Sequence, residues 1–140
     1  MIRLETVHGS CVALDGRAIL ILGPSGSGKS ALALAMMSIG AGLVSDDRTV
    51  LQRCGAQLMA DAPDAIRGRI EARGIGILGA GAVGPAEVVL VVDLGLAARE
   101  RLPPPATRDM LGVAIPLVLG PWAPHLHHAL RQYMLGGRTD

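Results

Sequence analysis

Short apolar stretches separated by glycine and polar residues predict mostly strands in the first two thirds of the chain. Asp15-Gly16 is a strong two-residue turn signal that joins two of these strands as a hairpin. Val88–Leu94 is a continuous apolar run, which is typical of a strand buried on both faces. The strands predicted in this region, with His8-Gly9 between the first two, are Ile2–Val7, Ser10–Leu14, Arg17–Leu22, Gly42–Arg48, Thr49–Arg53, Gln57–Ala60 and Val88–Leu94.

Two segments carry apolar residues at the spacing of a helix. Lys29–Ile39 follows a Gly-rich loop and ends at Gly40, where glycine can take the left-handed conformation of a helix cap. Pro124–Leu135 is the second helix and closes the chain. Strands outnumber helices, so the pattern predicts a strand-rich α/β fold with a mixed sheet, one helix after the loop and one at the C-terminus. A regular alternation of strands and helices, as in a doubly wound fold, is not predicted.

The remaining segments are less regular. Asp61–Gly68 is predicted to be a loop with one helical turn, and Arg69–Leu78 alternates charged and apolar residues as an edge strand does. Ala97–Asp109 contains three consecutive prolines and is predicted to be an exposed connection. Leu111–Leu119 is predicted to be a strand that Pro116 either interrupts or restricts to an edge.

The composition indicates one folded domain with an aliphatic core. A chain of 140 residues is long enough to bury a core, and 50% hydrophobic with 18% charged residues argues against disorder. Trp122 and Tyr133 are the only aromatic residues of the Phe, Tyr and Trp types. The formal net charge of +1 and the lack of interleaved aromatics give no sign of a nucleic-acid partner.

The segment between the third predicted strand and the first predicted helix matches the phosphate-binding motif G-x-x-x-x-G-K-[ST]. Backbone N–H groups of such a loop, and of the helix that follows, surround phosphate oxygens. Lys29 can reach the β- and γ-phosphates, and the Ser30 hydroxyl can hold Mg²⁺. Lys29 is also the only lysine among thirteen basic residues. The motif predicts nucleotide binding by Gly23, Pro24, Ser25, Gly26, Ser27, Gly28, Lys29 and Ser30.

Cysteine content and the lack of a signal segment predict a cytoplasmic protein. Cys11 and Cys54 do not make a disulfide framework, and a nucleotide site suggests the cytosol, so both are predicted to be reduced and buried. Arg3 and Glu5 interrupt the N-terminal stretch, which therefore does not resemble a signal peptide. The longest uncharged runs are broken by glycine or proline and are too short for a membrane span.

Asp46-Asp47 is the second candidate for chemistry, because it ends a short apolar strand just beyond the phosphate loop. One carboxylate there can bind Mg²⁺, and a second can accept a proton from an attacking hydroxyl. The alternative is a solvated turn, in which acidic pairs are common. Three other residues also have a purely structural interpretation. Glu71 and Arg73 can be exposed charges of an edge strand, and His8 can be a structural histidine.

Two other features are interpreted structurally. His125, His127 and His128 form a compact set that could hold a metal, but helix-surface histidines without an acidic partner are usually not ligands. Trp122, close to two prolines, is predicted to be a packing anchor.

The motifs together resemble the catalytic domain of the HPr kinase/phosphorylase family. The resemblance rests on their order and spacing along nearly the whole chain, and it weakens after about Leu94. The E-x-R-G-x-G-[IV] segment is its most specific part. The matching segments are His8-Gly9, Gly23–Ser30, Leu43–Arg48, Glu71–Ile77 and Gly79–Val83.

The resemblance implies the chemistry of the site. Family enzymes transfer the ATP γ-phosphate to a serine of HPr, the phosphocarrier of the bacterial phosphotransferase system. Lys29 would steady the phosphates, and Ser30, Asp47 and Glu71 would coordinate Mg²⁺. One member of the Asp46/Asp47 pair would be the general base, with Asp47 favoured, and its neighbour would assist with metal or hydrogen bonding.

Three further residues take roles by the same resemblance. His8 would adjust the charge and orientation of the catalytic carboxylate, and Arg73, with the segment to Ile77, would shape the site beside the transferring phosphate. Arg101 resembles a later active arginine of the family, in an alignment that crosses a gap. The family's core is also similar to that of phosphoenolpyruvate carboxykinase, and family members form hexamers, which implies a homo-oligomer here.

Departures from the family pattern modify these expectations. The chain begins at the catalytic domain, so residues 1–140 are expected to form a single kinase domain without the family's N-terminal domain. Ala31 follows the phosphate loop where an acidic residue is common. The late V-P-V-x-x-G-R-N loop, associated with dephosphorylation, is replaced by Ile115–Trp122 without the Arg-Asn pair. We therefore expect a kinase with weak or absent phosphorylase activity.

Two other functions remain compatible with the sequence. A small-molecule kinase would keep the site and change its acceptor, and a regulatory module would bind ATP without turnover. The Asp46-Asp47 pair distinguishes the last possibility, since a pure sensor has less need of a carboxylate base.

Overall fold

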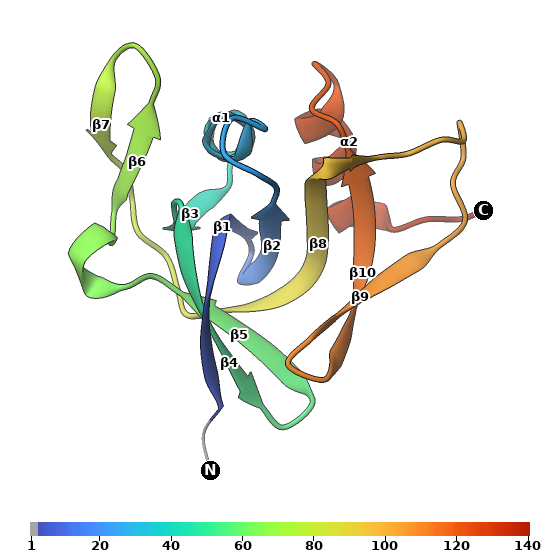
Figure 1. Cartoon of the computed structure of the whole chain (residues 1–140), viewed down its shortest axis with the longest axis horizontal. Helices are drawn as coiled ribbons and strands as arrows, with labels where there is room; N and C mark the ends of the chain where they lie inside the picture. The colour runs from blue at the N-terminus through green and yellow to red at the C-terminus, as the bar shows by residue number, and fades with distance from the viewer. Residues whose placement is uncertain (1–2) are drawn as a thin grey trace.

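Most of the chain forms one strongly curved sheet with two helices against it (Figure 1). The computed structural model describes residues 3–140. The first half contains β1 (Leu4–Leu14), β2 (Arg17–Leu22), α1 (Lys29–Ser38), β3 (Gly42–Ser45), β4 (Arg48–Cys54), β5 (Gln57–Asp61) and the short 3₁₀ helix η1 (Asp64–Ile66). The second half contains β6 (Arg69–Ala72), β7 (Gly76–Gly79), β8 (Ala86–Ala97), β9 (Ala106–Met110), β10 (Val113–Gly120) and α2 (Leu126–Gly136).

The β2 strand lies at the centre of the fold. It pairs antiparallel with β1 and parallel with β8, and β8 in turn pairs parallel with β10. Ile19 and Ile21 point into the core beneath the helices, whereas Ala18 and Leu20 point into a second core enclosed by the curved strands. Burial on both faces explains why this strand is a continuous apolar run.

The strands β3 and β4 act as one interrupted partner of β1. β3 pairs with Cys11–Ala13 and β4 pairs with Leu4–His8, both antiparallel. The register shifts between Cys11 and Val12, and Asp46 and Asp47 fall in the gap between β3 and β4. An irregularity of this kind bends a strand and turns its side chains in a new direction. It places the two carboxylates beside the end of the phosphate loop.

A separate two-stranded sheet stands beside α1. β6 and β7 pair antiparallel, from Arg69 opposite Gly79 to Ala72 opposite Gly76. Ile70 is buried in the helix-side core, while all four residues of β7 are exposed. Figure 1 shows this hairpin on one side of α1 and α2 on the other.

The strand-rich mixed α/β fold with a helix after the loop and a C-terminal helix is confirmed. The first two predicted strands are a single strand that continues through His8-Gly9, because β4 takes over as the partner of β1 where β3 ends. Ile2, the predicted start of that strand, lies outside the described residues. Among residues 3–140, no helix is long and apolar enough to cross a membrane.

Two predictions in the C-terminal third are corrected. The predicted connection Ala97–Asp109 contains β9, which is exposed but pairs with β10 along its whole length. β10 is not interrupted and lies between β8 and β9, and only its first part, up to Pro116, pairs with β9 alone and is an edge on the β8 side. It tolerates Pro116 because pairing with β8 begins only at Leu117, so the missing N–H group costs no bond on that side.

The two cysteines differ in environment and therefore in their expected reactivity. Both are free, as expected, but only Cys11 is buried, and Cys54 is exposed at the end of β4. Burial raises the pKa of the Cys11 thiol, which keeps it protonated and unreactive. We expect a thiol reagent to label one cysteine in the folded protein and two after denaturation. Mass mapping that finds rapid labelling of Cys11 in the folded chain would contradict this.

Candidate active site

The Gly-rich loop of the predicted phosphate-binding motif connects β2 to α1, as the motif predicted. Gly23, Gly26 and Gly28 have φ angles of 149°, 84° and 100°, which residues with side chains rarely adopt. The helix begins here, because Leu32 N donates to Gly28 O at 2.8 Å. No side chain caps this helix start, so its first backbone N–H groups are available for an anion.

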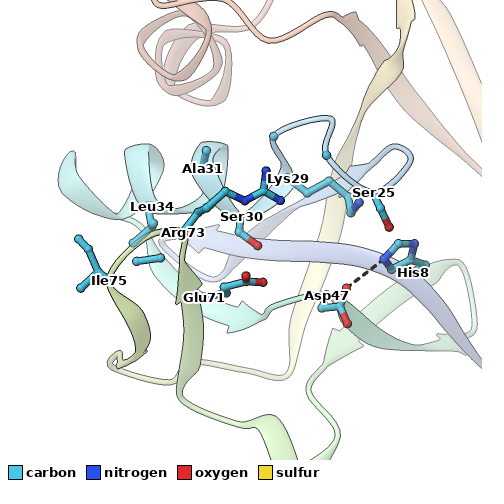
Figure 2. Close-up of a pocket in the computed structure, with 13 residues that line it drawn as sticks. His8, Ser25, Lys29, Ser30, Ala31, Leu34, Asp47, Glu71, Arg73 and Ile75 are labelled. Carbon is cyan, nitrogen blue, oxygen red and sulfur yellow. Dashed lines mark hydrogen bonds and ion pairs between the residues drawn. The ribbon is translucent and has the colours of Figure 1, made fainter.

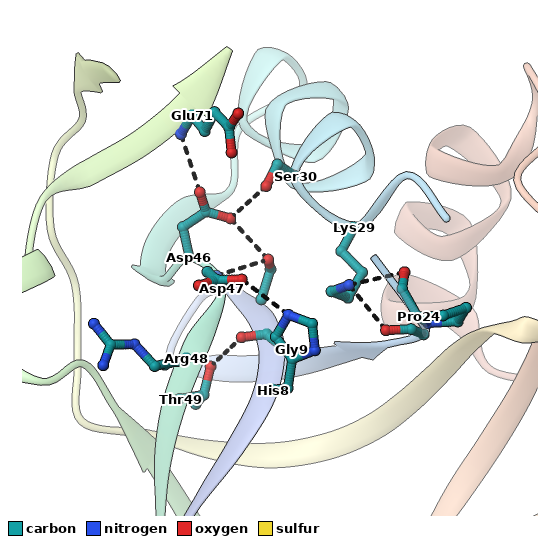
Figure 3. Close-up of polar contacts among 12 residues, drawn as sticks. His8, Gly9, Pro24, Lys29, Ser30, Asp46, Asp47, Arg48, Thr49 and Glu71 are labelled. Carbon is teal, nitrogen blue, oxygen red and sulfur yellow. Dashed lines mark hydrogen bonds and ion pairs between the residues drawn. The ribbon is translucent and has the colours of Figure 1, made fainter. Parts of the chain in front are cut away.

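Lys29 is a buried cation at the base of the loop. Its side chain is 7% exposed, and its Nζ donates to Gly23 O at 2.8 Å and to Pro24 O at 3.1 Å (Figure 3). Within residues 3–140, no carboxylate lies within ion-pair distance of this ammonium group. A buried charge held only by neutral carbonyls is well prepared for an anionic ligand.

Asp46 fixes three segments of the site to one another. Its Oδ1 accepts from Ser10 Oγ at 2.8 Å and from Ser30 Oγ at 2.7 Å, and its Oδ2 accepts from the backbone N of Glu71 at 3.0 Å (Figure 3). Asp46 is 6% exposed. Both of its oxygens are thus engaged with β1, α1 and β6, and it positions the Ser30 hydroxyl.

Asp47 is held in a different way and faces solvent. Its φ of 67° is in the left-handed region, and Arg48 N donates to Asp46 O at 2.7 Å across it, which makes a tight three-residue turn. Gly9 N donates to Asp47 O at 2.9 Å and closes this turn against β1. The side chain is 65% exposed, and His8 Nε2 donates to its Oδ1 at 2.9 Å. A strained backbone residue with an oriented, accessible carboxylate is typical of a functional site.

A cavity of about 520 Å³ extends from the phosphate loop to the β6–β7 hairpin (Figure 2). One end of it is polar and contains His8, Lys29, Ser30, Asp47 and Glu71. The other end has an apolar wall made of Ala31, Leu34, Ala72 and Ile75.

The β6–β7 hairpin contributes Glu71 and Arg73 to the cavity. Alternation along β6 turns Ile70 and Ala72 inward and leaves Glu71 exposed toward the opening. In Figure 2 the Glu71 carboxylate lies below Ser30, and the Arg73 side chain is directed toward the start of α1. The hairpin therefore adds one carboxylate and one guanidinium group to the loop and the aspartate pair.

Most of the residues predicted for the site are brought together. His8, Lys29, Ser30, Asp47, Glu71 and Arg73 line the same cavity, and Asp46 lies beneath it in contact with Ser30. Arg101 does not line it, and lies in the exposed connection between β8 and β9. No cluster of three or more His, Cys, Asp or Glu suited to a metal occurs in residues 3–140, the C-terminal histidines included.

Two buried hydroxyls, those of Ser10 and Thr49, support the site although no motif pointed to them. Ser10 Oγ donates to Asp46 and accepts from the backbone N of Asp47 at 3.2 Å, so it supports both carboxylates. Thr49 Oγ1 donates to Gly9 O at 2.9 Å and fixes the strand that carries His8. Both residues are fully buried. A buried hydroxyl on a strand gives no periodic signal in the sequence. For Ser10, its position directly after His8-Gly9 was a signal that could have connected it with the site.

Comparisons with known proteins show which family the chain resembles. The family model described as HPr Serine kinase C-terminal domain matches residues 1–100. The HPr kinase/phosphorylase of Lactobacillus acidophilus is 37% identical over 116 residues, which cover 77% of this chain and 34% of that protein. The enzyme of the same name from Caldanaerobacter subterraneus subsp. tengcongensis is 46% identical over 74 residues, covering 52% of this chain and 24% of that protein.

A solved structure extends the likeness to the whole fold. The structure described as the Hpr(Ser) kinase/phosphatase from Coxiella burnetii superposes with a TM-score of 0.80 at 29% sequence identity. The match covers 94% of this chain and 97% of that chain. The chain spans about a third or less of the length of the curated relatives it matches. By its sequence and its fold, the chain belongs to the family of HPr serine kinase C-terminal domains.

Proposed function

We propose that this protein is an ATP- and Mg²⁺-dependent kinase that phosphorylates a serine of an HPr-type phosphocarrier protein. The observation that carries the proposal is the accessible Asp47 carboxylate, oriented by His8 in the same cavity as the phosphate loop. A phosphate loop alone supports nucleotide binding. An oriented carboxylate beside it also supports transfer to a hydroxyl group.

The residues present fit a nucleoside triphosphate with Mg²⁺. The uncapped start of α1 and the Lys29 ammonium favour the phosphates. Ser30, Glu71 and Asp47 offer the oxygen ligands that Mg²⁺ prefers, and that ion keeps several waters and uses phosphate oxygens as well. When bound, Mg²⁺ would neutralise part of the charge on the phosphates.

The reaction assigned to the side chains is an in-line displacement. Asp47 accepts the proton of the serine hydroxyl as the serine oxygen bonds to the γ-phosphorus, and the bond from that phosphorus to the β–γ bridging oxygen breaks. The products are phosphoserine and ADP. Lys29 and Arg73 stabilise negative charge on the phosphoryl oxygens, and Asp46 keeps the Ser30 hydroxyl in place.

A protein acceptor is favoured by the exposure of the base. The Asp47 side chain is 65% exposed and His8 beside it is also open to solvent, so a serine on the surface of another protein can reach them. A small-molecule kinase more often encloses its acceptor to exclude water. The names of the relatives supply the acceptor, HPr. The proposal places the protein in the cytoplasm with ATP and phosphocarriers.

Transfer of the γ-phosphate from radiolabelled ATP to purified HPr tests the proposal. We expect label on HPr that depends on Mg²⁺, with HPr lacking its acceptor serine as the control. Binding of ATP without label on any HPr-type protein would contradict the kinase proposal. It would favour an ATP-binding regulatory module or a kinase for another acceptor.

Phosphorylase activity, the removal of the phosphoserine phosphoryl group by inorganic phosphate, is expected to be weak. The segment at Ile115–Trp122 has Pro121 and Trp122 in place of the Arg-Asn pair expected from the family pattern. Without that guanidinium group, inorganic phosphate has less to hold it for attack on phosphoserine. We expect phosphorylated HPr and inorganic phosphate to release pyrophosphate at least about tenfold more slowly than the forward reaction, a factor that corresponds to roughly 1.4 kcal/mol of barrier. Rapid pyrophosphate release would overturn this expectation.

A further inference from the structure

Trp122 lies directly beside the phosphate loop. A Cβ atom added to Gly28, the residue before Lys29, would be 3.7 Å from Trp122 Cβ and 3.9 Å from its Cγ. The position is fixed by Gly120, where an added Cβ would meet the Leu94 backbone at 2.9 Å, and by Ala98 N, which donates to Gly120 O at 3.0 Å. Trp122 is nevertheless 38% exposed. The packing anchor expected from the sequence is thus an indole partly open to solvent at the nucleotide site.

The sheet places Trp122 and the catalytic carboxylate on opposite sides of the phosphate loop. Asp47 lies between β3 and β4, which pair with β1 on one side of β2. Trp122 follows β10, which pairs with β8 on the other side of β2. In Figure 1 the connection from β10 to α2 lies on the side of α1 away from the β6–β7 hairpin. The loop after β2 therefore separates the two residues.

In-line transfer sets the direction in which the nucleotide extends. The attacking oxygen enters from Asp47, so the leaving ADP points away from Asp47 across the loop. That direction leads toward the carboxyl ends of β8 and β10, the part of an open α/β sheet where ligands commonly bind. The side chain that a Cβ on Gly28 would contact is that of Trp122, which follows β10 on this side.

A second ring, that of His127, lies parallel to the Trp122 indole. The Trp122 and His127 rings are nearly parallel, at 7°, with centroids 6.3 Å apart, and His127 contacts His128 with centroids at 3.9 Å. Burial, followed by the neighbouring His128, lowers the pKa of His127, which keeps its imidazole neutral near pH 7. A neutral ring in the first turn of α2 thus lies parallel to the indole and adds no charge beside it.

We propose that Trp122 is the platform on which the nucleotide base stacks, an inference that rests on the proposed nucleotide function. Its large π-face offers a purine a stacking surface next to the loop that holds the phosphates. Stacking does not read base edges, so GTP is expected to bind about as well as ATP. Inorganic tripolyphosphate, which has no base, is expected to gain nothing from Trp122.

Fluorescence and calorimetry with two ligands test this platform. Trp122 is the only tryptophan, so quenching of its emission by MgATP and not by magnesium tripolyphosphate is expected. Trp122→Ala is expected to weaken MgATP binding about tenfold or more, the size of a lost base stack, and to change tripolyphosphate binding by less than about twofold. Trp122→Phe should keep most of the affinity. Leu135→Ala, at the exposed end of α2, is the matched control.

The outcomes separate this inference from the proposed function. If the unmodified protein binds neither ligand, the nucleotide function fails and the platform with it. If it binds both and Trp122→Ala weakens neither, or weakens both equally, only the platform is overturned. A selective loss of ATP in Ile75→Ala instead would place the base at the apolar end of the cavity and would also overturn it.

Discussion

Asp47→Asn is expected to lower the rate of phosphoryl transfer to HPr by roughly 10²–10⁴-fold, the usual contribution of a general base. The asparagine amide stays within hydrogen-bond distance of His8, but it cannot accept the serine proton. Asparagine also tolerates the left-handed backbone at this position. MgATP affinity is expected to stay within a few fold, because the phosphate loop, Ser30 and Glu71 are unchanged and the asparagine side chain still offers one oxygen to Mg²⁺. Single-turnover transfer and calorimetry with MgATP measure the two effects separately.

Asp46→Asn is the matched comparison and should behave differently. The Asp46 oxygens accept from Ser10, Ser30 and Glu71, so the amide NH₂ of asparagine either faces the Glu71 N–H donor or replaces the acceptor of both serine hydroxyls, which must then turn to new partners. An unsatisfied buried donor costs on the order of 1–3 kcal/mol. We expect a lower free energy of unfolding for Asp46→Asn and little change for Asp47→Asn. A folded, inactive Asp46→Asn beside an active Asp47→Asn would reverse the assignment of the base.

Asp47→Gly adds a check on the strained turn. Glycine adopts a φ of 67° without steric cost, so the free energy of unfolding is expected to stay equal or rise by about 0.5–1 kcal/mol, while transfer is lost. A gain in stability together with a loss of function would indicate that the residue is kept for its chemistry. A clear loss of stability would instead show that Asp47 serves the fold.

Lys29→Met is expected to weaken binding of both MgATP and magnesium tripolyphosphate by about 100-fold or more. The ammonium group is the buried cation beside the loop carbonyls, and each hydrogen bond from a charged donor to phosphate is worth roughly 1.5–3 kcal/mol. Methionine has a similar length. It avoids the cost of burying a charge, and this gain offsets the cost of leaving two carbonyl groups without a donor. The free energy of unfolding should therefore change by no more than about 1 kcal/mol.

Lys29→Arg is the control for charge alone. It keeps the positive charge, but the planar guanidinium is wider than an ammonium group and the site is 7% exposed. We expect this variant to bind MgATP at least about tenfold more weakly than the unmodified protein. Binding within about fivefold of the unmodified protein in Lys29→Met would show that the loop holds phosphates through its backbone alone.

Local features of the sequence predicted the elements that build the site. The turn at Asp15-Gly16 forms the hairpin between β1 and β2, and the Gly-rich loop joins β2 to α1 as predicted. These structures depend on neighbouring residues, so the chain carries their signal directly. The segment Glu71–Ile77 had no such local signal for its role, and only its resemblance to a family connected it with the loop.

Tertiary pairing produced the differences from those predictions. β9 is exposed and carries polar residues, and it forms because β10 offers it a free edge. β1 continues through His8-Gly9 because β4 replaces β3 as its partner. A connection of prolines and arginines keeps Arg101 exposed and away from the cavity.

The sequence by itself determined the phosphate loop, its lysine and the order of the acidic residues after it, because these follow from local backbone preferences and residue chemistry. Between Asp46 and Asp47 it offered only a preference for Asp47 that rests on the family resemblance. The tertiary structure separates their environments, since Ser10, Ser30 and Glu71 converge on Asp46 from distant parts of the chain and leave Asp47 facing the cavity. The same long-range packing places Trp122 beside Gly28, which no local pattern could show.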